Sequence, residues 1–234
     1  GGECGLHGAR FGDGWEREEL RMGIEEIGYQ CVYNTRTLVY DGHGQGVIRT
    51  AEDVAKTEPY IGTPAILEEF VPFDYEASIV MVNDGKRIVS FPVGQNIHRD
   101  GILDLCIVPA PRMSDSVRRR LVEQSEAFMR RCGYTGILAI EYFIRGEEIY
   151  FNEMAPRPHN SGHYTIEGCT TNQFRELCRY LLGEPLQEPE LGAPTVMNTL
   201  RGEDPQAARR LAVEFAPGKG HPAPRPAPGP QRTT

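Results

Sequence analysis

The chain has 234 residues, enough for one large domain or two small ones with a buried core. Its 25 Lys and Arg against 33 Asp and Glu give a net charge of −8, whereas nucleic-acid-binding domains carry a strongly positive face. No apolar run approaches the roughly 18 residues that a membrane-spanning helix needs. The composition therefore excludes a transmembrane helix and argues against nucleic acid as a partner.

The six cysteines are spread along the chain at positions 4, 31, 106, 132, 169 and 178, without a Cys-x-x-Cys pair or a metal-binding spacing with His. We interpret them as free thiols and predict a reducing, cytoplasmic location. The first ten residues have neither the apolar core of a signal peptide nor an initiator Met. We therefore expect the chain to be an excerpt of a longer protein.

In the first part of the chain, apolar residues recur at helical spacing between Trp15 and Ile27, and Gly28 is a plausible helix end. Short strands are predicted over 31–33, 47–49 and 65–70, and a short helix over 51–57. Residues 40–46 contain three glycines, which predicts a flexible loop between two strands. Residues 96–100 have the composition of a polar turn.

Two hairpins and two helices are predicted next. Strands over 75–82 and 87–91 flank an Asp-Gly turn, and strands over 136–144 and 149–154 form the second hairpin. Ser114 is a good N-cap for a helix reaching Cys132, and a helix over 171–182 ends at Gly183.

The ends of the chain lack these patterns, so we expect an irregular start over residues 1–14 and a structured domain over 15–200. Residues 201–234 then hold a partial C-terminal segment and a disordered tail, since the last 19 residues contain six Pro and three Gly. The predicted fold class is α+β, with antiparallel sheets flanked by helices.

The second hairpin brings two carboxylates together. If its loop is the three residues 146–148, cross-strand pairing places Glu141 opposite Glu153, and Phe143 opposite Phe151. Directly opposed like charges destabilise a sheet unless a cation lies between them. An all-oxygen site suits Mg²⁺, whereas Zn²⁺ normally recruits Cys or His. The alternative is a register slip that leaves both acids solvated.

Three other segments are candidates for binding. The loop after Glu153 places Arg157, two His, Asn and Ser between prolines, which suits a phosphate or carboxylate, although it is also typical of a polar turn. The glycine-rich loop over 40–46 resembles a phosphate cradle but has no Walker or dinucleotide motif. The strand end at 68–71, followed by Glu76, could receive an adenine edge and a ribose, or be merely exposed.

Taken in order, these segments resemble the N5-carboxyaminoimidazole ribonucleotide synthase family of ATP-grasp enzymes, which are ATP-dependent carboxylases of purine biosynthesis. The likeness covers roughly residues 20–200 and is most specific at Ile140-Glu141-Tyr142-Phe143 and at Phe151-Asn152-Glu153-Met154-Ala155-Pro156-Arg157-Pro158-His159-Asn160-Ser161-Gly162-His163. Other ATP-grasp ligases share the Glu and Asn-Glu pair without the Pro-His-Asn-Ser-Gly-His continuation.

The resemblance implies a role for each matching position. Glu141 and Glu153 would bind Mg²⁺ and, with Arg157, act in catalysis. The substrates would be held by Arg157, His159, Asn160 and Ser161. The ATP site would be formed by Asn34, Val39, Tyr40, Asp41, Gly42, His43, Gly44, Gln45, Glu68, Glu69, Phe70, Val71, Glu76, His98, Asn152 and Glu153.

The activity implied by the resemblance is the carboxylation of aminoimidazole ribonucleotide with bicarbonate and ATP through carboxyphosphate. ATP and Mg²⁺ would be the cofactors, and the family's pairing into dimers suggests a homodimer. Metal and cations would neutralise charge on the transferred phosphoryl group.

The chain departs from the family pattern at two positions and at its ends. Asn34 stands where the family has a lysine, and His43 where the loop carries Lys or Arg, so the phosphates lose two cations. The family's first domain is expected ahead of this region, and the Pro-rich sequence after Lys219 replaces a basic stretch, which suggests a shift of reading frame. The main alternative is therefore a catalytically impaired fragment or pseudoenzyme with weak nucleotide binding. A ligase for a different acid and amine is a third reading.

Overall fold

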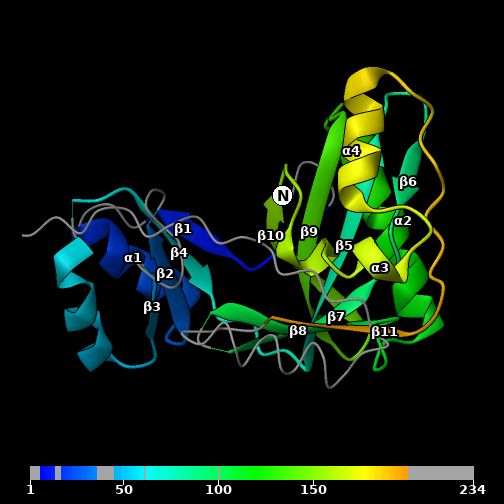
Figure 1. Cartoon of the computed structure of the whole chain (residues 1–234). Coiled ribbons are helices and arrows are strands. Elements are labelled where there is room, and N and C mark those ends of the chain that lie inside the picture. Colours follow the sequence, from blue (N-terminus) through cyan, green and yellow to red (C-terminus); the bar gives the residue numbers. More distant parts are fainter. Residues whose placement is uncertain (1–5, 14–16, 36–44, 61, 100, 200–234) are drawn as a thin grey trace, which may run out of the picture. The chain divides into compact units, whose positions relative to one another are not determined.

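The protein is described here from a computed structural model, which covers residues 6–13, 17–35, 45–60, 62–99 and 101–199. These residues form two sheets of antiparallel strands with flanking helices, which confirms the predicted α+β fold (Figure 1). The glycine-rich loop up to residue 44 and the Pro-rich segment from residue 201 lie outside the described residues, so the expectations for them stay predictions.

The smaller sheet has four strands. In spatial order they are β1 (Phe11–Asp13), β4 (Ala65–Glu69), β2 (Cys31–Thr35) and β3 (Gln45–Ile48). Helix α1 (Arg17–Ile27) buries Leu20 and Ile24 in the same apolar cluster as Tyr33 and Leu67. A 3₁₀ helix, η2 (Ala51–Tyr60), follows β3 and is longer than the helix predicted there. Strand β1 lies in the segment that the sequence predicted to be irregular.

The larger sheet has seven strands. Its main path is β10 (Glu148–Ala155), β9 (Gly136–Arg145), β5 (Tyr75–Asn83), β7 (Gly94–Arg99), β8 (Ile102–Val108) and β11 (Thr195–Asn198), and β6 (Ile88–Ser90) pairs with β5. Strands β7 and β8 replace the polar turn predicted at 96–100. The buried positions of β7 are Gly94, Gln95 and Asn96, which lack the apolar alternation that marks a strand.

Helices cover the two faces of this sheet (Figure 1). On one face Ile79, Met81 and Ile140 pack in one cluster with α2 (Asp115–Arg131). On the other, Val80, Val82, Ala139 and neighbouring residues pack in a second cluster with α4 (Gln173–Leu182). The alternation of side chains along β5 and β9 explains both clusters, because successive residues point to opposite faces. Glu76, Ser78 and Glu141 have the parity of the α4 face.

The helix caps follow the sequence signals. Ser114 is the N-cap of α2, and its Oγ accepts the Val117 N–H at 3.3 Å. Helix α4 begins two residues later than predicted, because Asn172 is its N-cap and accepts the backbone N–H groups of Phe174 and Arg175. It ends at Gly183, whose φ of +69° favours glycine. Two short helices, η3 (Asn160–Gly162) and α3 (Thr165–Gly168), precede α4 and were not predicted.

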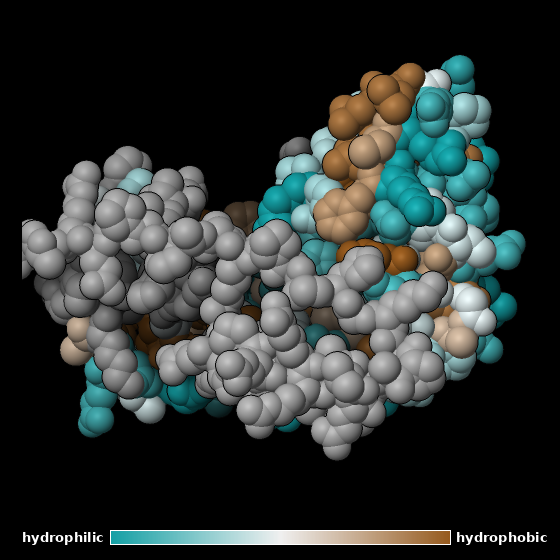
Figure 2. Space-filling view, in the orientation of Figure 1, coloured by the Kyte–Doolittle hydropathy of each residue, from teal (hydrophilic) through white to brown (hydrophobic). Residues whose placement is uncertain are grey.

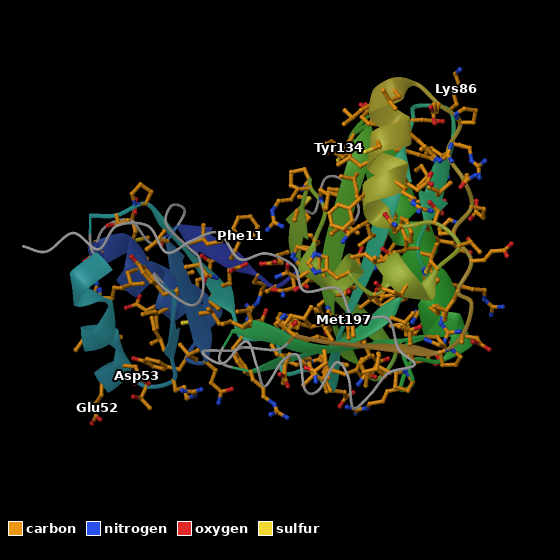
Figure 3. All side chains as sticks on the ribbon, in the orientation of Figure 1. Phe11, Glu52, Asp53, Lys86, Tyr134 and Met197 are labelled. Carbon is orange, nitrogen blue, oxygen red and sulfur yellow. The ribbon has the colours of Figure 1, made fainter. Side chains whose placement is uncertain are left out.

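Surface features agree with the predicted hairpin and composition. Lys86 lies exposed at the tip of the β5–β6 hairpin, where the Asp84 carboxylate accepts its backbone N–H at 2.8 Å (Figure 3).

Apolar side chains gather over α4, where Phe174, Leu181 and Leu182 are exposed (Figure 2). No helix in the described ranges is long and apolar enough to cross a membrane. Every cysteine among the described residues is a free thiol, as predicted.

Candidate functional site

The β9–β10 hairpin places Glu141 opposite Glu153, the register predicted from the sequence. The rest of that prediction was wrong, since the loop has two residues and Phe143 pairs with Tyr150. A β-bulge between Phe151 and Glu153 adds one residue to β10 and restores the predicted pairing beyond it. The bulge residue is Asn152, which is half-buried.

The bulge also decides which way Glu153 faces. Phe151 pairs with Tyr142 and packs against the α2 cluster. In a regular strand Glu153 would share that face, but the inserted residue turns it to the face of Glu141. Strand alternation alone would place Glu153 on one face with Phe151, so the bulge is what brings the two carboxylates together.

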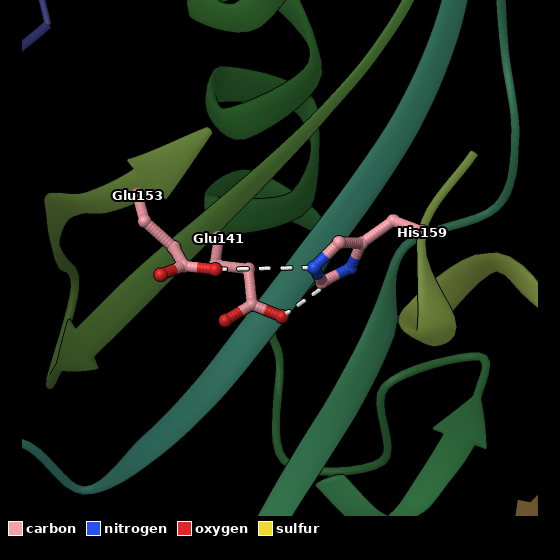
Figure 4. A group of neighbouring side chains, drawn as sticks. All are labelled: Glu141, Glu153 and His159. Atoms are coloured by element: carbon pink, nitrogen blue, oxygen red, sulfur yellow. Dashed lines mark ion pairs between the residues drawn. The ribbon is translucent and has the colours of Figure 1, made fainter. Parts of the chain in front are cut away.

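A third side chain, His159, completes the group. Its Nδ1 lies 3.8 Å from Oε1 of Glu141, and its Nε2 lies 3.8 Å from Oε1 of Glu153 (Figure 4). One ligand atom from each residue lies within 4.8 Å of the other two. The Glu141 side chain is 8 % exposed and that of His159 is 11 % exposed, whereas Glu153 is 60 % exposed. The group therefore has a buried floor and one carboxylate open to solvent.

Burial controls the protonation of this group. Burial, followed by the charge of Glu153, raises the pKa of Glu141 to about 7. Burial also lowers the pKa of His159 to about 4, aided by the positive charges of Arg157 and two other His. The imidazole is therefore neutral near pH 7 and does not compensate the carboxylates. Among the described residues, His159 is the only basic side chain within ion-pair distance of either acid.

These donors suit Mg²⁺. The two carboxylates, one of them buried, supply the oxygen ligands that a hard cation such as Mg²⁺ prefers, and the imidazole of His159 beside them is a nitrogen donor of the kind that Zn²⁺ recruits. The raised pKa of Glu141 reflects an unbalanced negative charge at this place, which a divalent cation would balance. Magnesium binding by Glu141 and Glu153 stays a prediction.

A chain of polar groups continues from Glu141 across the sheet. Asn96 Nδ2 donates to Glu141 Oε1 at 3.3 Å, and Asn96 Oδ1 accepts the Ser78 hydroxyl at 3.2 Å. Both side chains are buried. Sequence reasoning missed them because it treated the Asn96 segment as a turn, and a buried amide on a strand leaves no periodic signal. Their role in the structure is to orient the buried carboxylate.

Glu76 and His98 lie together on the neighbouring strands β5 and β7. Glu76 Oε2 forms a close contact with His98 Nδ1. Burial lowers the pKa of His98, but the hydrogen bond and charge of Glu76 and the charges of Glu141 and Glu153 outweigh it, so the pKa is raised. The pair predicted for the ribose and nucleotide, Glu76 and His98, is therefore close enough to Glu141 and Glu153 for their charges to affect the pKa of His98.

On the smaller sheet, Asn34 is tied to Glu68. Its Nδ2 donates to Glu68 Oε2, and its Oδ1 is buried with no hydrogen-bond partner among the described residues. Burial raises the pKa of Glu68, and the Asn34 bond lowers it in part. A neutral amide therefore stands beside a half-buried acid at the position where the resemblance implies a lysine.

The strand end predicted to receive adenine is partly engaged within the protein. The Glu69 N–H donates to the Arg10 carbonyl and the Phe70 N–H to the Gln30 carbonyl, both at 2.8 Å, and the Glu69 carboxylate pairs with Arg10 at 3.0 Å. Phe70 is exposed and Val71 is buried. Those two N–H groups are therefore not donors for a base, and the adenine role of residues 68–71 stays a prediction.

The loop after β10 holds the predicted substrate residues. Arg157 and Asn160 are exposed. Among the described residues, the Arg157 guanidinium donates only to the carbonyl of the neighbouring Pro158. Ser161 is buried, with its Oγ 2.9 Å from His159 Nδ1. The sequence did not predict that this loop folds back to place His159 beside the two acids. That contact depends on η3 and α3, which have no strong sequence signal.

Of the seven positions predicted for the phosphate loop, only one lies among the described residues. Gln45 begins β3 and pairs with Asn34 in the β2–β3 ladder. Val39, Tyr40, Asp41, Gly42, His43 and Gly44 lie outside the described residues.

Comparison with known proteins identifies the matching family model as the ATP-grasp domain, over residues 3–174. Among curated proteins, the chain is 39 % identical over 197 residues to N5-carboxyaminoimidazole ribonucleotide synthase of Haemophilus influenzae, covering 82 % of this chain and 53 % of that protein. It is 34 % identical over 213 residues to phosphoribosylaminoimidazole carboxylase of Schizosaccharomyces pombe, covering 86 % of this chain and 38 % of that protein. The chain thus spans about half or less of these relatives.

Solved structures give the same result. An ADP complex of N5-carboxyaminoimidazole ribonucleotide synthetase matches with a TM-score of 0.87 and 35 % identity, covering 92 % of this chain and 57 % of the other. The Aspergillus clavatus synthase in complex with ADP and 5-aminoimidazole ribonucleotide matches with a TM-score of 0.81 and 26 % identity, over 90 % of this chain and 57 % of the other. These likenesses confirm the resemblance inferred from the sequence.

Proposed function

Since this chain belongs to the ATP-grasp family, we propose that it binds Mg-ATP and forms the ATP-grasp region of an N5-carboxyaminoimidazole ribonucleotide synthase. The observation that carries the proposal is the opposed pair Glu141 and Glu153 with His159 beside them. The names of the similar proteins, and the ADP and 5-aminoimidazole ribonucleotide bound to one of them, support the choice of substrates.

The proposed reaction uses bicarbonate as the first acceptor. A bicarbonate oxygen attacks the γ-phosphorus of ATP, the bond to the β,γ-bridging oxygen breaks, and ADP leaves with formation of carboxyphosphate. The amine of aminoimidazole ribonucleotide then bonds to the carboxyl carbon, phosphate leaves and the amine loses a proton. Each step moves negative charge, so positioning and charge neutralisation do most of the catalysis.

This chain's residues have distinct tasks in that scheme. Glu141 and Glu153 hold Mg²⁺, which neutralises phosphoryl oxygens when bound. Neutral His159, oriented by the buried Ser161 hydroxyl, supplies a hydrogen bond to an anionic substrate without protonating it, and Arg157 supplies positive charge. His98 and Glu76 orient the nucleotide from the same sheet face.

A second candidate is a nucleotide-binding fragment without turnover. It is favoured by the contact between Asn34 and Glu68, because an amide committed to a carboxylate supplies no positive charge to a phosphate.

Release of ADP distinguishes the two candidates. The synthase predicts ADP formation that requires both bicarbonate and aminoimidazole ribonucleotide and is abolished in Glu153→Gln. The matched control is Glu148→Gln, an exposed acid of the same strand whose partner is Arg145, and it should keep the wild-type rate. Turnover unaffected by Glu153→Gln refutes the metal assignment, and binding of Mg-ADP without turnover favours the fragment.

A further inference from the structure

The amide of Gln173, in the first turn of α4, holds the backbone of His159. Gln173 Oε1 accepts the His159 N–H at 2.9 Å, and Gln173 Nε2 donates to the His159 carbonyl at 2.9 Å. One side chain thus satisfies both main-chain groups of a single residue 14 positions earlier. The Gln173 side chain is fully buried, so water does not compete for these bonds.

Gly162 makes room for this amide. A Cβ added at Gly162 would lie 2.6 Å from Gln173 Oε1 and 2.9 Å from Val80 Cγ2, closer than real contacts allow. The loop therefore approaches the amide only because residue 162 has no side chain. Thr165 links the loop to the helix, since its hydroxyl donates to the Gly162 carbonyl at 2.6 Å and accepts the backbone N–H of Gln173 at 3.2 Å.

The residue held in this way is the one that faces both carboxylates. Fixing the N–H and carbonyl of His159 fixes the direction in which its side chain leaves the loop, and the imidazole is then locked by Ser161 Oγ at 2.9 Å from Nδ1. An amide needed only to fill the core would not require two bonds to this one residue.

We propose that Gln173 is a positioning residue for His159 and orients its imidazole toward Glu141 and Glu153. In functional terms this rests on the proposed function, because His159 is assigned there to the substrate. The geometric part, however, is testable without turnover.

The test is the ¹H–¹⁵N spectrum of histidine side chains in the full chain, with His159 assigned by the loss of its signals in His159→Gln. Gln173→Met keeps a buried side chain of similar length but removes both hydrogen bonds. We expect the His159 imidazole signals to move by more than their linewidth while those of His98, held by Glu76, stay in place. Unchanged His159 signals would overturn the proposal.

A matched control separates positioning from general loosening. Thr171→Val removes a buried hydrogen bond of 2.6 Å to Glu176 near the start of the same helix, with no bond to His159. It should lower the melting temperature and leave the His159 signals unchanged. If it moves those signals as far as Gln173→Met does, the role of Gln173 is structural and the proposal fails. Should Gln173→Met not fold, Gln173→Glu keeps the acceptor for the His159 N–H and loses the donor, and must still move the signals.

Kinetics give a second reading where the protein turns over. Gln173→Met should reduce bicarbonate-dependent ADP formation about 10- to 100-fold, since displacements near 1 Å have that effect. The Kd for Mg-ADP should stay within about threefold, because the change spares both carboxylates. An equal loss in rate and in Mg-ADP binding contradicts positioning of His159. A wild type that does not bind Mg-ADP refutes the proposed function, and the imidazole spectra still decide the role of Gln173.

Discussion

Replacing the buried acid Glu141 by Gln should stabilise the metal-free protein. Glu141 is held at a pKa of about 7 against an ordinary 4.5, first by burial and then by the charge of Glu153. A pKa shift of one unit corresponds to about 1.4 kcal/mol. The raised pKa of Glu141 therefore lowers the free energy of unfolding by up to about 3 kcal/mol at pH 7. The Gln side chain keeps an oxygen to accept the Asn96 bond and offers an N–H toward Glu153.

The expected gain is a melting temperature about 5 to 10 °C higher than wild type at pH 7 without Mg²⁺, for a domain of this size. The gain should depend on pH in a defined direction. Because the folded pKa is raised, the contribution of Glu141 to stability is fully present below about pH 4.5 and lost as the pH rises to about 7. The advantage of the Gln variant should therefore vanish near pH 4 and be largest at and above pH 7.

Glu176→Gln is the matched control for the same chemical change. The Glu176 carboxylate is also fully buried, but it accepts the Thr171 hydroxyl at 2.6 Å and the Gln187 N–H at 2.8 Å, and it pairs with Arg179. Loss of the Glu176 carboxylate should lower the melting temperature, whereas loss of the Glu141 carboxylate should raise it. Thermal denaturation of both variants between pH 4 and 8 measures this. A destabilised Glu141→Gln at pH 7, or a gain independent of pH, would refute the assignment of Glu141 as an unbalanced buried acid.

Three further predictions follow from other contacts. Asn34→Lys should tighten Mg-ATP binding about three- to tenfold in calorimetry, because the ammonium adds a cation beside Glu68; no gain over the uncharged Asn34→Met would contradict it. Ser114→Ala should cost about 1 kcal/mol of unfolding free energy by loss of the α2 cap, measured by urea denaturation, with Mg-ADP binding unchanged. Gly162→Ala should destabilise the protein and move the His159 imidazole signals, since the added methyl meets the Gln173 amide; an unshifted spectrum would show that the loop adapts without cost.

The sequence predicted the elements that carry strong local signals. The helix capped by Ser114, the Asp-Gly hairpin and the end of α4 at Gly183 follow from capping and turn chemistry that depends on few residues. Strand β7 escaped because its buried positions include Gln95 and Asn96, and the Asn96 side chain bonds to Glu141 on another strand.

The opposition of Glu141 and Glu153 was predicted through two errors that cancel. The loop has two residues instead of three, and the bulge at Asn152 adds the residue that the shorter loop lacks. The approach of His159 and its support by Gln173 depend on how the loop returns to the sheet, which is tertiary packing that no local pattern encodes. The resemblance named His159 but not Gln173, which holds its backbone.

The most direct test of the central claim is calorimetric titration of the chain with ADP in the presence of Mg²⁺ and again in excess chelator. If Glu141 and Glu153 hold the metal at a nucleotide, binding must require Mg²⁺ and weaken at least about tenfold in Glu153→Gln but not in Glu148→Gln. Equal affinity with and without Mg²⁺, or equal affinity in wild type and Glu153→Gln, would contradict it.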